Sequence, residues 1–284
     1  MVVALAGLKR RKSNEQSEFQ SMDKPTQVTI TVTDGASIPD PRERRLINAW
    51  SLAFTGSITT LALLCFFSPL YLDIVSFLPD GLLVTFEVTI FSIICTIPIG
   101  ILTGLGRLSR NRFINLIAST YVEIIRGIPL LVQLFYIYYA LGRFVNVPPI
   151  MSAVVAISFC YGAYMGEVVR AGILAVDSGQ TEAARSLGFS RLQTLRYVIL
   201  PQAMRTILPP VGNECIAMLK DTSLVSIIAV ADLLRRGREY AAQTFTYFET
   251  YTVIALIYLI ITLLLSKGVS IMEGRLDYYD NEKR

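Results

Sequence analysis

Polar and charged side chains interrupt two long apolar stretches of this chain, and their chemistry could act on a solute. A charged group inside a membrane helix costs at least about 2.5 kcal/mol on an insertion scale, so such groups pair with one another, meet water or line a path. A zwitterionic solute needs a donor for its carboxylate and an acceptor for its ammonium group, and this set contains both. The candidate path residues are Tyr161, Tyr164, Glu167, Asn213, Lys220, Asp221, Thr222 and Ser223.

The spacing of these residues supports two interpretations. Tyr164 and Glu167 are three positions apart and share roughly one helix face. As a hypothesis, Glu167 and Asp221 act on an ammonium group or on gating, while Lys220 or the two hydroxyl groups that follow Asp221 act on a carboxylate. The alternative is structural: Glu167 pairs with Arg170, i to i+3, and Lys220 pairs with Asp221 or a neighbouring helix. The sequence leaves both interpretations open.

The sequence lacks the usual machinery of an enzyme. It contains no histidine, which is the commonest general base and metal ligand. No GxxxxGKS/T, HExxH or GxSxG pattern occurs, so we predict no nucleotide site of the usual kind and no common hydrolase site. The four cysteines stand singly in apolar runs, and we interpret them as small hydrophobic residues rather than as disulfides or metal ligands. We therefore predict a chain that is not an enzyme and holds no cofactor itself.

The elements that must position the polar residues are membrane helices. With 53% hydrophobic residues and a mean hydropathy of +0.52, the chain is too apolar for a soluble domain of 284 residues. We predict an all-α, polytopic integral membrane protein with about six transmembrane helices. The expected spans are residues 46–72, 82–106, 118–141, 150–175, 206–234 and 250–266.

Several of these spans depart from a plain apolar helix. Gly100 and Gly104 form a GxxxG pair, and a second such pair lies in the fourth span. These pairs permit close helix contact in lipid, although glycine is also simply common in membrane helices. Pro129 is expected to bend the third span. The fifth span, 206–234, is interrupted by prolines and charges, so it must face protein, water or a solute.

The placement of the charges sets the expected orientation. Three arginines precede the first span, and the next basic residue, Arg107, follows the second. By the positive-inside rule both termini are then cytoplasmic, with 1–45 as a mostly disordered tail and 46–284 as the membrane domain. Six spans place three other arginines outside, where they form a functional surface unless the fifth span is partly re-entrant. These arginines are Arg235, Arg236 and Arg238.

One long amphipathic, charged segment, 178–201, lies between two apolar spans. We expect Thr181 to cap a short helix, Gly188 to end or bend it, and Ser190 to cap a second amphipathic helix that ends before Pro201. Two consecutive alanines leave the surface of the first helix almost bare, so a partner can approach closely. The segment is therefore expected to bind a partner from the water side.

Within this segment Glu182-Ala183-Ala184 is followed after three residues by Gly188, and after nine more by Val198-Ile199-Leu200-Pro201. This order resembles the cytoplasmic signature of permease subunits in ABC importers, with valine where isoleucine is usual. The preceding Gly179-Gln180 resembles the version found in polar-amino-acid uptake permeases. Further stretches similar to that subfamily are YVEIIRGIPLLVQLF at 121–135, YGAYMGEVVRAG at 161–172 and LKDTSLVSIIAVADLLRR at 219–236.

The resemblance implies a type I ABC importer permease fold in an amino acid uptake system of a bacterial inner membrane. It implies a second permease subunit, identical or related, two cytoplasmic ATP-binding subunits that hold ATP and Mg, an external substrate-binding protein, and no nucleic acid. The segment 178–201 would then be the coupling segment, docked in a groove of the ATPase. The residues expected to couple are Gly179, Gln180, Glu182, Ala183, Ala184, Gly188 and Pro201.

An ion-coupled secondary transporter or a channel for small polar solutes is the alternative, because intramembrane charges would serve either class. Secondary transporters often carry inverted repeats, and this sequence shows no convincing internal repeat. Transport that persists without ATP and without another subunit would favour the alternative.

Overall fold

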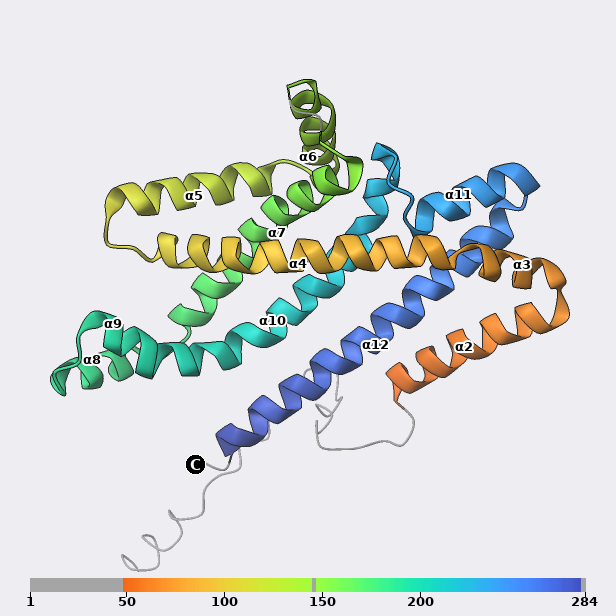
Figure 1. Ribbon diagram of the computed structural model, residues 1–284. Helices are drawn as coiled ribbons and strands as arrows, with labels where there is room; N and C mark the ends of the chain where they lie inside the picture. The colour runs from red at the N-terminus through yellow and green to blue at the C-terminus, as the bar shows by residue number, and fades with distance from the viewer. Residues whose placement is uncertain (1–47, 145–146, 282–284) are drawn as a thin grey trace, which may run out of the picture. The chain divides into compact units, whose positions relative to one another are not determined.

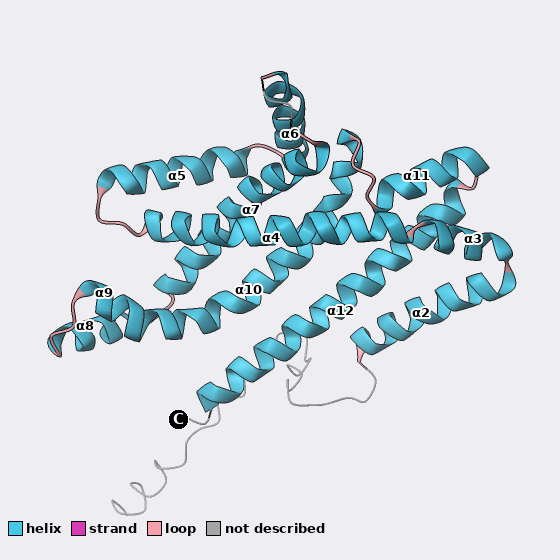
Figure 2. Cartoon of the chain, in the orientation of Figure 1, coloured by secondary structure: helices cyan, strands magenta, loops and turns pink. Residues whose placement is uncertain are grey.

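In the computed structural model the residues described are 48–144 and 147–281 (Figure 1), so the predicted tail, 1–45, lies outside them. Every regular element within these ranges is helical, which confirms the predicted all-α class (Figure 2). The α-helices are α2 (Ala49–Phe67), α3 (Pro69–Phe77), α4 (Pro79–Arg107), α5 (Arg112–Gly127), α6 (Leu130–Phe135), α7 (Pro149–Leu174), α8 (Ser178–Ser186), α9 (Arg191–Gln193), α10 (Leu200–Asp221), α11 (Leu233–Thr244) and α12 (Tyr247–Asn281). Shorter helical turns are the π helices η1 (Tyr136–Ala140) and η3 (Thr194–Ile199) and the 3-10 helices η2 (Leu141–Arg143) and η4 (Thr222–Ile228).

Within the described ranges, four stretches are long and apolar enough to cross a bilayer, which makes this a multi-pass membrane protein. They are Ala49–Phe67, Pro69–Arg107, Pro149–Leu174 and Tyr247–Leu276. A fifth is reached if the bent pair Arg112–Gly127 and Leu130–Ala140 counts as one span. The remaining predicted span corresponds to α10. Its 22 residues reach about 33 Å, but its composition is not apolar enough for it to be one of the candidate membrane spans.

The helices α4 and α7 pack along one another through their glycines. A Cβ atom placed on Gly100 would lie 2.6 Å from the Cβ of Met165, and one placed on Gly104 would lie 2.7 Å from the carbonyl oxygen of Gly166. Neither distance is compatible with a side chain, so the two backbones approach as closely as the GxxxG pairs permit. Of the two interpretations of these glycines, helix contact is therefore the one that the structure supports.

Replacing Gly104 by leucine should separate α4 from α7 and lower the stability of the membrane domain by about 1–3 kcal/mol, the usual cost of overpacking. Thermal melting in detergent, followed by the fraction that remains monodisperse, measures this loss. The matched control is Gly56→Leu on α2, where an added Cβ atom meets nothing within 4 Å. Equal melting temperatures for the two variants would contradict the glycine contact.

The predicted bend at Pro129 is confirmed and is larger than a kink, because α5 and the helical stretch after it are bent by 101°. At this break the side-chain amide of Gln133 donates to the carbonyl oxygen of Ile125 at 2.9 Å and to that of Ile128 at 2.8 Å. An unsatisfied carbonyl in apolar surroundings costs several kcal/mol, so Gln133, which is 6% exposed, stabilises the break. We did not single out Gln133 from the sequence, although a lone amide in an apolar run was the available signal.

The interruption predicted in the fifth span is also confirmed. The helix α10 ends at Asp221, and the chain continues as η4 before Ala229 adopts a left-handed conformation with φ of 68°. The turn η4 contacts α4, α6 and α7, and it buries Val225 and Ile228 in the same apolar cluster as Ile157 of α7. Irregular backbone at membrane depth is tolerated where protein covers it, and η4 meets that condition.

The helix α11 begins at a buried carboxylate that the sequence analysis did not single out. Asp232 accepts hydrogen bonds from the N–H groups of Leu234 at 3.2 Å and Arg235 at 3.1 Å, as an N-cap does. The N–H of Leu233 donates to the hydroxyl oxygen of Thr85 at 3.1 Å, which attaches α11 to α4.

Candidate functional site

The coupling segment begins with α8, and its cap differs from the predicted one. Asp177, not Thr181, precedes the helix, and its Oδ1 accepts a hydrogen bond from the N–H of Gly179 at 2.8 Å. Thr181 lies inside α8, so its prediction as the N-cap is wrong. Aspartate is the stronger N-cap residue of the two, and it stands where the chain leaves α7.

The predicted break and second cap are both confirmed. Gly188 has a φ of 85°, a left-handed conformation that favours glycine, and it ends α8. The N–H of Gln193 donates to the Ser190 hydroxyl oxygen at 3.3 Å, while the N–H of Ser190 donates to the Gln193 side-chain oxygen at 2.8 Å. This reciprocal pair is a capping box, so the second helix of the segment starts at a defined residue.

The second helix does not end before Pro201 as expected. The chain runs from α9 through the π helix η3 directly into α10, with Pro201 in its first turn. A change of helical register accommodates a residue that has no N–H to donate. Behind this junction the side chain of Gln202 donates to that of Gln180 at 3.3 Å, which connects α8 to α10.

The exposed surface of the segment is partly apolar. Glu182 and Ala183 face solvent, whereas Ala184 is only 4% exposed and packs inward, so one of the two alanines rather than both offers bare surface. Nearby, Leu187 is 79% exposed and Leu192 is 72% exposed. Exposed leucines beside a bare helix surface are suited to burial against another protein.

Three of the predicted path residues lie together in a row of polar and aromatic side chains. The hydroxyl of Tyr161 on α7 donates to a carboxylate oxygen of Asp221 on α10 at 2.8 Å. The rings of Tyr161 and Tyr164 have centroids 6.0 Å apart, and the guanidinium of Arg126 on α5 lies 5.3 Å from the centroid of the Tyr164 ring. We call Arg126, Tyr164, Tyr161 and Asp221 the polar row. It connects three helices that are far apart in sequence.

Glu167 belongs to a different cluster. It forms ion pairs with Arg107 of α4 and with Arg170, whose Nε donates to it at 3.1 Å. The pairing with Arg170 agrees with the structural alternative, and Arg107 adds a contact between helices that the sequence analysis did not anticipate. Six residues of helix, about 9 Å of rise, separate Glu167 from Tyr161.

The other four candidate path residues differ in their exposure to solvent. Asn213 and Lys220 are exposed, Ser223 is half-buried, and the buried hydroxyl of Thr222 donates to the carbonyl oxygen of Leu219 at 2.6 Å. None of these four forms a hydrogen bond or ion pair with the polar row in the described part of the chain. Nor do the described residues contain a group of three or more His, Cys, Asp or Glu side chains that could hold a metal ion.

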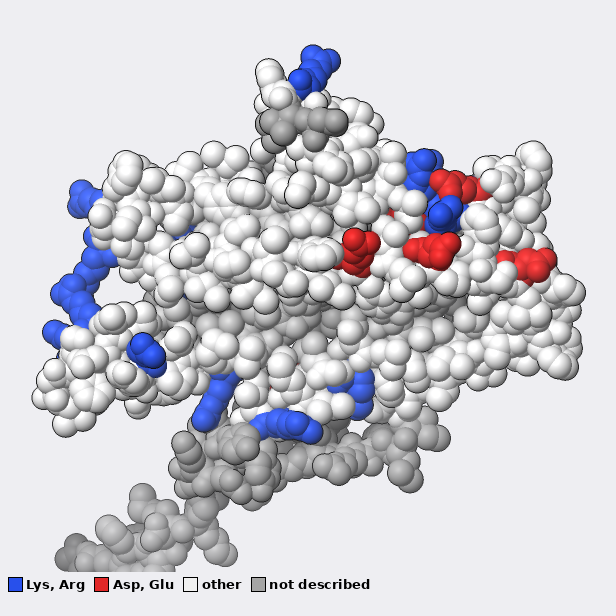
Figure 3. Space-filling view, in the orientation of Figure 1, with Lys and Arg blue, Asp and Glu red and all other residues white. Residues whose placement is uncertain are grey.

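The two ends of the membrane domain differ in charge. On the face in Figure 3, Lys and Arg gather over the end formed by α8, α9 and the turn from α4 to α5, while Asp and Glu gather with further basic side chains near α11. A multi-pass helical domain with a basic end, an amphipathic segment exposed there and a broken helix inside has the architecture of a membrane permease subunit.

Comparison with known proteins agrees with that class. Residues 96–278 match the family described as the binding-protein-dependent transport system inner membrane component, and the chain belongs to this family. It is 40% identical over 200 residues to the glutamine transport system permease protein GlnP of Escherichia coli (strain K12), covering 69% of this chain and 91% of that protein. It is 44% identical over 204 residues to the L-cystine transport system permease protein TcyB of Bacillus subtilis (strain 168), covering 71% and 87%.

Solved structures show the same fold. An amino acid ABC transporter crystallised with histidines matches with a TM-score of 0.69 and 43% identity over 72% of this chain and 96% of its own. The MetNI methionine ABC transporter in an inward-facing conformation matches with a TM-score of 0.60 at 20% identity, over 74% of this chain and 98% of its own, and so supports the fold alone. The predicted type I permease fold is therefore confirmed.

The Glu167 cluster predicts a structural effect. Glu167→Gln leaves Arg107 and Arg170 without their partner, and should lower stability by about 1–3 kcal/mol, between the values of exposed and buried pairs. The matched control is Glu123→Gln, an exposed carboxylate on α5. The melting temperatures of both variants in detergent test this expectation. It would be wrong if Glu167→Gln had the melting temperature of the wild type but abolished transport.

Proposed function

We propose that this permease subunit belongs to an ATP-driven uptake system for polar amino acids. The observation that carries the proposal is the coupling segment, which is capped at both of its helices and exposed at one end of the membrane domain. The names of the glutamine and L-cystine permeases support the substrate class. An ion-coupled secondary transporter or a channel is not favoured, because the chain belongs to a family of binding-protein-dependent systems.

The partners follow from this assignment. Two cytoplasmic subunits bind ATP and Mg and hydrolyse ATP, a second permease subunit, identical or related, completes the membrane domain, and an external binding protein delivers the amino acid. Glu182, Ala183 and the exposed Leu187 enter the groove of the ATPase, where a basic residue pairs with Glu182. The exposure of all three side chains supports this role.

The orientation in the membrane is inferred from the charged end of the domain that carries α8 and α9. The basic face near α8 and α9 lies in the cytoplasm of a bacterium, under its inner membrane, and both termini lie on that side. The excess of Lys and Arg at this end supports the orientation.

The solute path passes the polar row. Tyr161 and Asp221 close it from α7 and α10, because their hydrogen bond bridges the two helices, and a solute with donors and acceptors replaces that bond as it passes. Asp221 accepts the ammonium group. Glu167 holds α4 to α7 instead of meeting the solute.

A charge reversal in the coupling segment tests the function. Glu182→Lys should reduce ATP-dependent uptake of glutamine at least about tenfold, because it places a cation against a basic groove. Gly188→Val should do the same, since valine does not adopt the left-handed conformation of Gly188. Both variants should insert in the membrane at wild-type levels. Uptake is measured in cells that express the complete transporter.

The control for the charge reversal is Glu273→Lys, an exposed carboxylate on α12 outside the coupling segment, which should transport normally. Undiminished uptake in both Glu182→Lys and Gly188→Val would remove the coupling role. Uptake by the permease alone, without ATP, would instead support the secondary transporter.

A further inference from the structure

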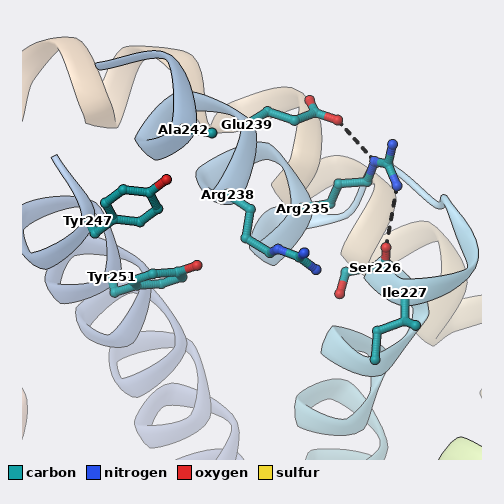
Figure 4. Close-up of a pocket in the computed structure, with 8 residues that line it drawn as sticks. All are labelled: Ser226, Ile227, Arg235, Arg238, Glu239, Ala242, Tyr247 and Tyr251. Atoms are coloured by element: carbon teal, nitrogen blue, oxygen red, sulfur yellow. Dashed lines mark hydrogen bonds and ion pairs between the residues drawn. The ribbon is translucent and has the colours of Figure 1, made fainter. Parts of the chain in front are cut away.

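A cavity of about 560 Å³ opens between α11, the start of α12 and η4 (Figure 4). Its volume falls within the range of small-molecule sites in proteins. Its charged lining residues are Arg235, Arg238 and Glu239, and two aromatic residues, Tyr247 and Tyr251, form the opposite wall. Neither the coupling segment nor the polar row contributes to it.

The cavity lies at the end of the membrane domain opposite the coupling segment. Arg236 of α11 packs at the N-terminal end of α4, where a Cβ atom on Gly81 would lie 2.7 Å from its Cγ atom. The coupling segment lies at the other end, where Arg110, just beyond α4, and Arg185 of α8 line one pocket. The 29 residues of α4 span about 43 Å, more than the ~30 Å of the hydrocarbon core. The two sites therefore face opposite sides of the membrane.

The charges around the cavity are unbalanced. Glu239 pairs with Arg235 at 2.9 Å and with Arg236 at 3.5 Å, so one carboxylate serves two guanidinium groups. Arg238 has no hydrogen bond or ion pair with the described residues, and its side chain extends into the cavity toward η4. The hydroxyl groups of Tyr247 and Tyr251 point from α12 toward the Arg238 side (Figure 4). The cavity thus presents a free cation beside two neutral donors.

We propose that this cavity is a second ligand site, on the outer side of the membrane, which binds the carboxylate of a free amino acid. Arg238 takes the carboxylate in a charge-assisted pair, and the hydroxyl groups of Tyr247 and Tyr251 donate to it. Glu239 does not repel the ligand, because two arginines already neutralise it. The choice of an amino acid as ligand rests on the proposed uptake function, whereas recognition of the carboxylate rests on the cavity itself.

Equilibrium binding to the purified full-length permease, without binding protein or ATPase, tests the site. The probes are L-glutamine, N-acetyl-L-glutamine, which keeps the carboxylate but lacks the ammonium group, and L-glutaminamide, which lacks the carboxylate. The first two should bind, and L-glutaminamide should bind at least about tenfold more weakly. Because this comparison uses the wild-type protein, it does not depend on the folding of a variant.

Arg238→Gln should weaken the binding of N-acetyl-L-glutamine at least about tenfold, and Arg275→Gln, an exposed arginine on α12 far along the chain, should leave it unchanged. The proposal would be overturned if Arg238→Gln and the wild type bound N-acetyl-L-glutamine equally well. It would also be overturned if none of the three probes bound at millimolar concentration. A variant that binds the probes normally but loses affinity for the external binding protein would make this a protein-docking surface instead. The uptake assay tests the proposed function separately: if that function is wrong, ATP-dependent uptake is absent whatever the binding results are.

Discussion

The close contact between α4 and α7 is the interaction on which the rest of the structure depends. Gly100 and Gly104 bring the two backbones together, and no residue with a side chain would permit the same distance. Contact at this distance lets Arg107 reach Glu167 across the helix pair. It also provides the surface on which α10 packs against α7, so that Tyr161 meets Asp221. Helix association in lipid depends on such packing, because lipid tails are as apolar as the helix surfaces.

A second constraint is that backbone groups freed by broken helices need partners inside the protein. Among the described residues, three breaks lie around α4 and α7, and a side chain supplies a donor or an acceptor at each. Gln133 satisfies the carbonyls at the bend after α5, Thr222 donates where α10 gives way to η4, and Asp232 accepts from the first turn of α11. Water cannot fill these positions in the hydrocarbon core, so the side chains hold irregular backbone at fixed places. The breaks are consequently positions at which the membrane domain can present polar groups.

The two ends of the membrane domain therefore differ. One end presents the segment 178–201 with its exposed leucines, and the other carries α11 with its arginines and the cavity beside Arg238. Within the segment, α9 continues through η3 into α10 without an intervening loop. The helix α10 ends at Asp221, so this continuous helical stretch connects the second half of the segment to the polar row.

The sequence by itself determined the features that depend on neighbouring residues: the membrane class, the bend at Pro129, the break at Gly188 and the cap at Ser190. Propensity, hydropathy and capping act within a few residues, so they can be read along the chain. Where two residues could cap the same helix, the sequence favoured the wrong one: Asp177 rather than Thr181 caps α8. The sequence also did not show that Ala184 packs inward while Ala183 faces solvent.

Only the tertiary structure decided which polar groups meet. Glu167 finds Arg107 across 60 residues, Tyr161 finds Asp221 across another 60, and Thr85 binds the start of α11 across 148. These pairings depend on how closely α4, α7 and α10 pack and on their rotation about their axes. No periodicity within one helix encodes that rotation, because it is set by the facing side chains of another helix.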